Sequence, residues 1–211
     1  MLLALDQVQA DLGGPELRCP DRPGWLRPWG FAQTRSLRSA GGGRVWLRPR
    51  RVHCASSRVA HVLLPELAPP HRAYTIDVMG PALPASAGGR SHRTISADLG
   101  IPADTVRDWM RQVRAGAEWL HVQGTIAAHT LDSLLPVIVP AGTAPGDAMA
   151  ALATAAAASV RRLGSIASPW QIIALIARGQ LLSPVRGGQA HTSAAQPCPQ
   201  DHDSMTTAVT R

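Results

Sequence analysis

Apolar residues recur at helical spacing near the start of residues 92–114, HRTISADLGIPADTVRDWMRQVR. Ile95 and Leu99 lie four positions apart, so they share one face of a short helix. Gly100 follows at once, where the end of a helix favours a residue that tolerates positive φ. The pattern therefore predicts a first helix that ends at Gly100.

A second helix is predicted to begin at Pro102, because the missing N–H of proline costs nothing at the first helical position. Asp104 lies in its first turn, where the helix dipole favours an anion. Val106 and Trp109 are three positions apart and turn one face of this helix back onto the first. The pair is typical of a helix-turn-helix, and an ordinary αα-hairpin in a helical core is the alternative.

The opposite face of the second helix carries the candidate DNA contacts, since a recognition helix presents such a face to the major groove. Arg107, one turn into the helix, is expected to reach base edges, and Arg111, one turn later, a phosphate. The predicted DNA-binding residues are Arg93, Thr94, Ala103, Asp104, Thr105, Arg107, Asp108, Arg111 and Arg114.

Residues 31–38 and 44–52 are predicted to form two β-strands, joined by the turn sequence SAGGG. Val45 and Leu47 alternate with arginine and tryptophan, as in a strand that is buried on one face. Pro49 then confines the second strand to a sheet edge or ends it. The sequence thus predicts a β-hairpin ahead of the helices.

Residues 61–80 begin as a connector, and a helix is predicted from about Ala73 as the first of a three-helix DNA-binding unit. Pro81 and Pro84 interrupt this helix, because an interior proline costs roughly 3 kcal/mol. The helix therefore either stops at Met79 or is distorted in this region.

The second half of the chain is predicted to be helical. The helix that contains Trp109 is expected to continue through Trp119, residues 147–163 form an alanine-rich helix, and residues 170–182 form a more apolar one. The side chains of the last helix that are expected to be buried are Ile172, Ile173, Leu175 and Ile176. Residues 183–211 are rich in Gly, Pro and Gln, and are expected to be disordered.

The charge is concentrated near the N-terminus. The formal net charge is +7 and every basic residue is an arginine; residues 17–58 hold ten arginines and a single acid, Asp21. A basic surface attracts nucleic acid, so double-stranded DNA is the expected partner, with an acidic protein or a membrane surface as the alternative.

No segment is predicted to cross a membrane, because the longest apolar run, residues 148–160, is too short. The N-terminus reaches Asp6 too early for a signal peptide and lacks its positive region. The three cysteines are widely spaced and do not suggest a disulfide framework. The expected location is therefore the cytoplasm.

Cys19 and Cys54 flank the predicted hairpin in the settings CPDR and CASS. A zinc ribbon has a CxxC knuckle on each side of such a hairpin, because zinc takes four ligands. Arg22 and Ser57 stand where the second cysteine of each knuckle would be. We therefore expect no cofactor and no stoichiometric zinc, and treat the two cysteines as vestigial ligands.

A metal site would need His53 and His61 to complete a Cys2His2 set with Cys19 and Cys54. His53 is adjacent to Cys54, and adjacent residues seldom chelate one ion. The favoured interpretation is that the two cysteines are small buried hydrophobic residues.

With AHVLLP at 60–65 and the 92–114 segment, these half-knuckles resemble a family of uncharacterised proteins from high-GC bacteria. That family has a zinc-ribbon-like domain of unknown function followed by a helix-turn-helix. The resemblance covers roughly residues 17–120, and the motif WQIIALIARGQLLSP is similar as well. It implies a transposase-like N-terminal DNA-binding architecture, with zinc ligation carried over to Cys19 and Cys54 only.

Four residues depart from the family pattern or from what a helix favours: Arg22, Ser57, Pro81 and Pro84. A single base change accounts for a Cys to Arg, a Cys to Ser or a Leu to Pro replacement. The departures lead to the hypothesis that this copy no longer depends on metal, or has decayed and lost its function.

The expected fold is α+β: a small zinc-ribbon-like β-hairpin module, a three-helix helix-turn-helix domain, C-terminal helices and a disordered tail. The expected domains are a degenerate zinc-ribbon-like module at 17–65, the helix-turn-helix domain at 72–120, a helical region at 130–182 and the tail at 183–211.

The chain is expected not to be an enzyme. The acids that follow Arg114 lie outside any strand–helix alternation, and no GxSxG, P-loop or HExxH motif is present. The expected function is DNA binding, by a small regulator or by a remnant of the DNA-binding half of a mobile element. The alternative is a helical interaction protein that does not bind DNA, and residues 170–182 are the candidate surface for a homodimer or a protein partner.

Overall fold

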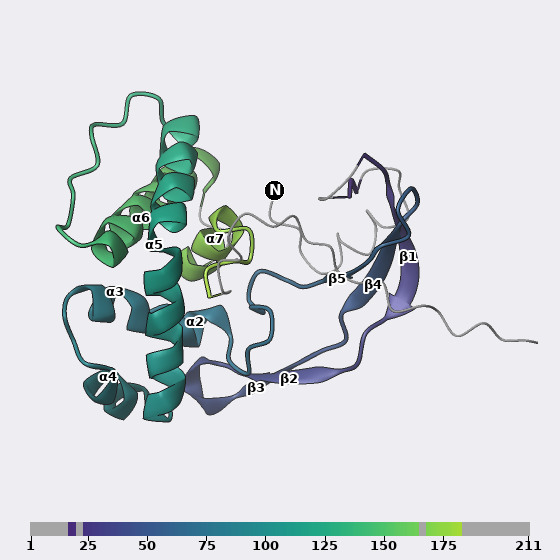
Figure 1. Cartoon of the computed structure of the whole chain (residues 1–211), viewed down its shortest axis with the longest axis horizontal. Helices are drawn as coiled ribbons and strands as arrows, with labels where there is room; N and C mark the ends of the chain where they lie inside the picture. The colour runs from purple at the N-terminus through teal and green to yellow at the C-terminus, as the bar shows by residue number, and fades with distance from the viewer. Residues whose placement is uncertain (1–16, 20–22, 165–167, 183–211) are drawn as a thin grey trace, which may run out of the picture.

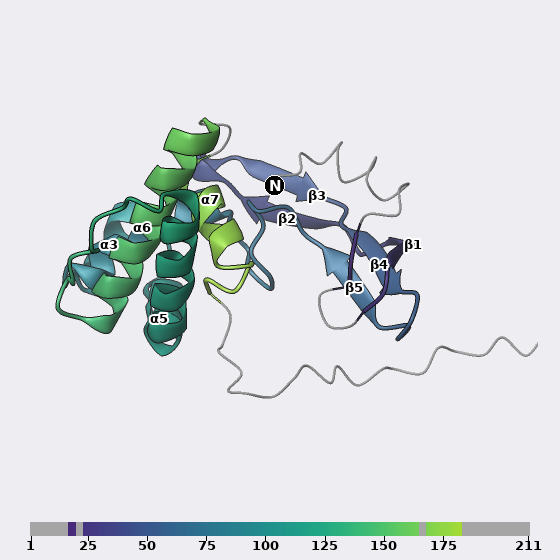
Figure 2. The ribbon, with the colours of Figure 1, turned by 90° about the horizontal axis from the view of Figure 1, so that it is seen from above.

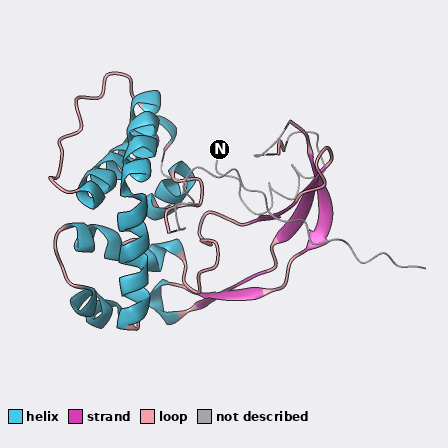
Figure 3. Cartoon of the chain, in the orientation of Figure 1, coloured by secondary structure: helices cyan, strands magenta, loops and turns pink. Residues whose placement is uncertain are grey.

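The computed structural model describes residues 17–19, 23–164 and 168–182. It is a mixed α+β structure, in which a small antiparallel sheet region precedes several helices (Figures 1 and 3). The larger, three-stranded sheet and the helices lie at opposite ends of the long axis of the molecule, and a two-stranded sheet runs between them (Figure 1). The coarse fold class predicted from the sequence is therefore confirmed.

Three antiparallel strands form a sheet in the order β1-β4-β5. They are β1 (Leu26–Phe31), β4 (Arg50–Cys54) and β5 (Ala60–Leu63). One face of the sheet is buried, and its residues Val52 and Cys54 are both 0% exposed. The sequence analysis did not predict β1 or β5.

The predicted hairpin is present but shorter. Strand β2 (Arg35–Arg38) pairs with β3 (Arg44–Leu47), and the turn between them contains a short 3-10 helix, η1 (Ala40–Gly42). The second strand does not extend to residue 52: β3 stops at Leu47, in agreement with the alternative that Pro49 ends it, and beyond Pro49 the chain enters β4, which belongs to the other sheet.

Six α-helices are described after the strands. They are α2 (Ile76–Met79), α3 (Ala82–Ala87), α4 (His92–Leu99), α5 (Ala103–Leu131), α6 (Ala144–Leu163) and α7 (Pro169–Ile176). Their buried side chains form one continuous hydrophobic core that runs from Ile76 to Leu182. The ranges 72–120 and 130–182, treated separately in the sequence analysis, thus share a core (Figure 2).

Helix α5 extends twelve residues beyond Trp119, the last residue predicted for it, because α6 covers its second half. The two helices approach closely at Gly124, where an added Cβ would lie 2.8 Å from backbone atoms of Ala151 and Leu152. The predicted alanine-rich helix is confirmed as α6, which begins three residues early. Thr143 caps it by accepting a hydrogen bond from the N–H of Gly146.

The two prolines end one helix and begin the next. Helix α2 ends at Met79, one of the two predicted outcomes, although it starts at Ile76 rather than near Ala73. Pro81 occupies the N-cap position of α3, and Pro84 lies in the first turn of that helix. The N–H groups of a first turn have no helical partner, so proline removes no hydrogen bond there.

Helix α7 is shorter than predicted, because the backbone turns at Arg178 and Gly179, which both have positive φ. Ile172 and Ile173 are buried as expected, and Ile176 is partly buried. Leu175 is 39% exposed, so the expectation that it would be buried was wrong. The predicted disorder of 183–211 lies outside the described residues.

The hairpin is held against the helices by the connecting segment. The N–H of Arg38 donates to the carbonyl of Ala73 (2.8 Å), and the N–H of Thr75 donates to the carbonyl of Arg38 (2.9 Å). Arg35 Nη2 donates to the carbonyl of Pro69 (3.0 Å). These bonds fix the position of the hairpin relative to the N-terminal half of α5.

Candidate nucleic-acid interface

The turn between α4 and α5 has the geometry that its sequence predicts. Ser91 caps α4 by accepting a hydrogen bond from the N–H of Thr94, and Gly100 ends it with φ 62° and ψ 32°. Pro102 stands one position ahead of its predicted place, at the N-cap of α5. Ser96 Oγ donates to the carbonyl of Ile101 (2.6 Å), which ties the turn to the preceding helix.

The inner faces of α4 and α5 are packed together as expected. Ile95, Val106 and Trp109 are at most 2% exposed and belong to the main core. The ring of Tyr74 meets Trp109 edge-on, with centroids 5.5 Å apart. Trp109 is buried and Tyr74 partly buried, and the contact of their rings helps to fix the rotation of α5 and so its outer face.

Three arginines form a stripe on the outer face of α5. Arg107, Arg111 and Arg114 follow one another at spacings of four and three residues and are all exposed. The side chain of Arg107 is 64% exposed and forms a surface ion pair with Asp104 (2.9 Å). Arg93, on α4, is also exposed.

The remaining predicted site residues are less available. Thr94 is exposed, but its N–H and Oγ1 are both within hydrogen-bond distance of Ser91 Oγ. Ala103 and Thr105 are partly buried. Thr94 thus takes part in the cap of α4, Ala103 and Thr105 lie in the first turn of α5, and their contacts to DNA stay predictions.

Asp108 has a role inside the molecule that the sequence analysis missed. Its Oδ2 accepts hydrogen bonds from Arg72 Nη1 (2.8 Å) and Gln112 Nε2 (2.9 Å), and its Oδ1 pairs with Arg111. Arg72 also donates to Gln112 and to the carbonyl of Leu182. Asp108 thus links α5 to Arg72 in the segment before α2, and Arg72 in turn contacts Leu182 near the end of the described chain.

The contacts of Asp108 also set its protonation. Burial raises the pKa of this carboxyl, but hydrogen bonds from Arg72 and Gln112, together with the charges of Arg72 and Arg111, outweigh burial and hold the pKa below its ordinary value. The group is therefore a carboxylate at neutral pH, and it draws Arg111 toward the helix surface.

The arginine-rich hairpin lies beside the turn between α4 and α5. The glycine turn of the hairpin and residues Leu99 to Ile101 line one groove of about 550 Å³, to which Arg38 and Arg44 also contribute. Arg38 is stacked over Tyr74, with its guanidinium 5.6 Å from the ring centroid. Arg38 and Arg44 thus lie near the start of α5, although they are far from it in the sequence, and no local sequence pattern predicts this proximity.

The two cysteines come together as a buried pair. Cys19 is 7% and Cys54 0% exposed, and both belong to the small core of the three-stranded sheet. Hydrogen bonds from Ser57 lower the pKa of Cys54 to about 7, against burial, which raises it. His61 Nε2 lies 3.6 Å from Cys19 Sγ. Within the described residues, no three His, Cys, Asp or Glu side chains are grouped so as to hold a metal ion.

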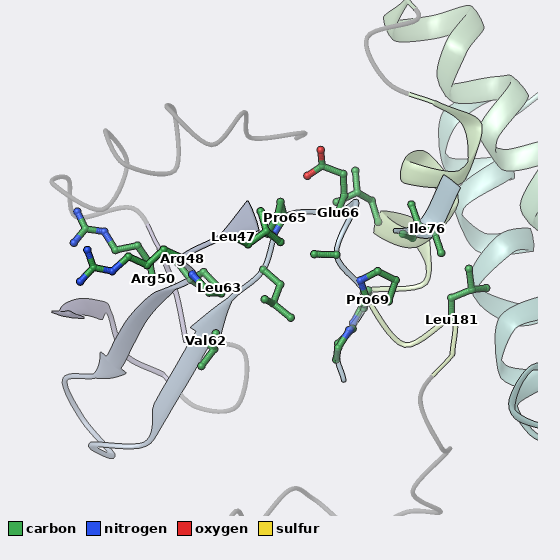
Figure 4. A pocket seen from close by; sticks show the side chains of 18 of the residues that line it. Leu47, Arg48, Arg50, Val62, Leu63, Pro65, Glu66, Pro69, Ile76 and Leu181 are labelled. Carbon is green, nitrogen blue, oxygen red and sulfur yellow. The ribbon is translucent and has the colours of Figure 1, made fainter. Parts of the chain in front are cut away.

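A separate apolar cavity of about 470 Å³ lies between β5 and α7 (Figure 4). Leu63, Pro65, Ile76 and Leu181 are among its lining residues. None of the predicted DNA-binding residues lines it. It is therefore distinct from the candidate nucleic-acid interface.

Comparison with known proteins found no match: no family model, curated protein or solved structure matches this chain. The family resemblance drawn from sequence motifs therefore stays a prediction. Among the helices that the structure describes, none has both the length and the apolar character needed to cross a membrane. Function is inferred below from the side chains of the chain itself.

Proposed function

We propose that the chain is a DNA-binding protein in which α4 and α5 act as a helix-turn-helix. The observation that carries the proposal is the exposed stripe of Arg107, Arg111 and Arg114 on a helix whose opposite face is fixed in the core. A helix of this kind enters the major groove with its N-terminal turns against the base edges. A small regulator and a remnant of a mobile element would both use it in this way.

The arginines of α5 are available to DNA despite their ion pairs. The pair of Arg107 with Asp104 is highly exposed, and exposed pairs contribute about 0–1 kcal/mol. A phosphate or a guanine edge can therefore replace the carboxylate at small cost. Arg107 lies one turn into α5 and is assigned to base edges, whereas Arg111, one turn later, is assigned to a phosphate.

The hairpin extends the positive surface. Arg38 and Arg44 lie at the groove beside the start of α5, so the DNA backbone that flanks the major groove passes within their reach. Contacts of this kind position a protein on DNA without reading sequence. They favour binding that is largely independent of sequence, with specificity supplied by few residues of α5.

Binding of a labelled duplex, measured by fluorescence anisotropy, tests the proposal. Arg107→Ala should lower affinity for the preferred sequence by about 1–3 kcal/mol and reduce discrimination between sequences. Arg161→Ala is the matched control, because Arg161 is a 56% exposed arginine of α6 that is ion-paired with Asp132 just beyond the C-terminal end of α5. Equal affinity of the parent protein, Arg107→Ala and Arg161→Ala, all three folded, would contradict the proposal.

A second candidate function is protein interaction, which an exposed apolar surface favours. Val122 and Ile126, four residues apart on α5, are 45% and 58% exposed. In the connector to α6, Leu134 is 92% and Val137 86% exposed. These exposed side chains, rather than residues 170–182 with their buried isoleucines, are the better candidates for a homodimer or partner contact. Light scattering of Ile126→Asp beside the parent protein tests it, since only the parent should associate with rising concentration.

A further inference from the structure

The three-stranded sheet has a second face that the core does not use. Side chains alternate across a strand, so Arg27 and Trp29 of β1 point away from buried Leu26. The register pairs Arg27 with His53 and Arg51 with Val62, and residues paired in this way face the same side. We use the name outer sheet face for the five residues Arg27, Trp29, Arg51, His53 and Val62.

The outer sheet face is open to solvent and carries an aromatic ring on its edge strand, β1. Trp29 is 46% and Val62 49% exposed. The guanidinium of Arg51 lies 4.4 Å from the centroid of the Trp29 ring, and the ring of His53 meets that ring edge-on at 6.1 Å. An exposed aromatic ring with a guanidinium against it is an arrangement suited to stacking bases and contacting phosphates.

The same side of the chain continues to a second tryptophan. Trp25 lies four residues before Trp29, which is about 13 Å along an extended strand, and the alternation places both on the same side. The guanidinium of Arg18 lies 3.7 Å from the centroid of the Trp25 ring. The pair of Trp25 and Arg18 thus repeats the arrangement of Trp29 and Arg51 on the outer sheet face, an aromatic ring with an arginine against it.

The charge of this region selects the partner. The described part of residues 17–58 has no acidic side chain, so the face is complementary to a polyanion. Duplex DNA hides the flat faces of its bases, whereas a single strand exposes them for stacking on aromatic rings and guanidinium planes. Cations interleaved with aromatic rings on an open sheet are suited to single strands, and an acidic protein offers no flat faces of this kind.

We propose that the outer sheet face, together with Trp25 and Arg18, binds single-stranded nucleic acid. Bases stack on Trp25 and Trp29, and the arginines leave or share the rings to contact phosphates. The site lies at the end of the molecule away from α4 and α5 (Figure 1). It goes beyond duplex binding by α5 and does not depend on it.

The test is fluorescence anisotropy with labelled oligo(dT) and oligo(rU) of about 20 nucleotides, a length that exceeds typical site sizes. Trp29→Ala should weaken binding of the single strand about tenfold or more, and Trp29→Phe should restore part of it, because a ring is kept for stacking. Trp46→Ala is the matched control: Trp46 is 68% exposed on β3 of the separate hairpin, and its loss should leave single-strand affinity unchanged.

Failure of this proposal is separable from failure of the duplex proposal, because each variant is titrated with both ligands. Trp29→Ala should spare duplex affinity, and Arg107→Ala should spare single-strand affinity. Tighter binding of oligo(rU) would assign RNA as the partner through the 2′-hydroxyl, and equal binding would assign stacking alone. If Trp29→Ala does not fold, Arg27→Gln replaces it in the test, because Arg27 is exposed and belongs to the same face. Unchanged single-strand affinity in the folded variants, or no single-strand binding by the parent protein, would overturn the proposal.

Discussion

Asp108 shows how one carboxylate can serve the fold on the face that is proposed to meet DNA. Its side chain is 30% exposed and joins Arg72, Arg111 and Gln112. The guanidinium of Arg72 is 15% exposed, so removing the carboxylate would leave a largely buried cation without its ion partner. Asp108 thus supports the fold beside the arginine stripe, and its contact to DNA stays a prediction.

Asp108→Asn should therefore lower stability at neutral pH by about 1.5–3 kcal/mol, the usual contribution of a hydrogen bond to a charged group. The folded pKa of Asp108 lies below the unfolded value, so its stabilisation is fully present above about pH 3.9 and is lost as pH falls through the folded pKa. Urea unfolding of both proteins between neutral and acid pH should show the two stabilities converging.

Asp98→Asn is the control for that experiment. Asp98 is 52% exposed and pairs with Arg90 at the surface, so its loss should change stability by at most about 1 kcal/mol. A difference between parent and Asp108→Asn that stays constant down to acid pH would contradict the account of Asp108.

At the level of the elements, the approach of α5 to α6 depends on Gly124. Helix propensity alone predicts that Gly124→Ala stabilises the protein by about 1 kcal/mol. The added methyl would, however, lie 2.8 Å from the backbone of Ala151 and Leu152, which cannot move without separating the helices. We expect a net loss of about 1–3 kcal/mol, seen as a lower Tm. A raised Tm would show that the helices are less closely packed.

The three-stranded sheet should hold its core without metal. Cys19 and Cys54 are buried, but Ser57 stands where a CxxC knuckle would need its second cysteine, and a tetrahedral zinc shell needs four ligands. Metal analysis of protein purified without chelator should find less than one equivalent of zinc, and EDTA should leave the thermal melt unchanged. One equivalent of zinc, lost in Cys54→Ser, would contradict this and would make His61 the third ligand, since it already lies 3.6 Å from Cys19 Sγ.

Elements with clear local periodicity were predictable from the sequence, and the others were not. Helix α4, the start of α5 and the hairpin β2–β3 follow from patterns within each segment. Strand β1 has the sequence LRPWGF, in which apolar and polar residues do not alternate and in which Pro28 and Gly30 disfavour a regular strand. The second half of α5 is stabilised by α6, which lies far along the chain.

The candidate site divides in the same way. The exposed arginines of α5 follow from the helical period, because burial of Val106 and Trp109 decides which face remains outside. The ion pair of Arg72 with Asp108 joins residues 36 positions apart and has no local signal. The outer sheet face likewise requires strand pairings that the sequence analysis did not contain.

On the scale of the whole molecule, two positive surfaces lie at its two ends. The arginine stripe of α5 is proposed to bind duplex DNA, and the outer sheet face is proposed to bind a single strand. The hairpin β2–β3 joins them, because its backbone is hydrogen-bonded to Ala73 and Thr75 beside the helices. A protein with both surfaces would be suited to a junction between duplex and single strand.

The most direct test of duplex binding through α5 is the salt dependence of affinity. Each arginine–phosphate contact releases condensed counterions, so six contacts would lower affinity about a thousandfold between 50 and 200 mM salt. Arg111→Ala should reduce the slope of log K against log [salt] by about 1 and weaken all duplex sequences alike, while Arg161→Ala keeps the parent slope. Identical slopes for the parent, Arg111→Ala and Arg161→Ala, with all three folded, would contradict the assignment of α5 to DNA.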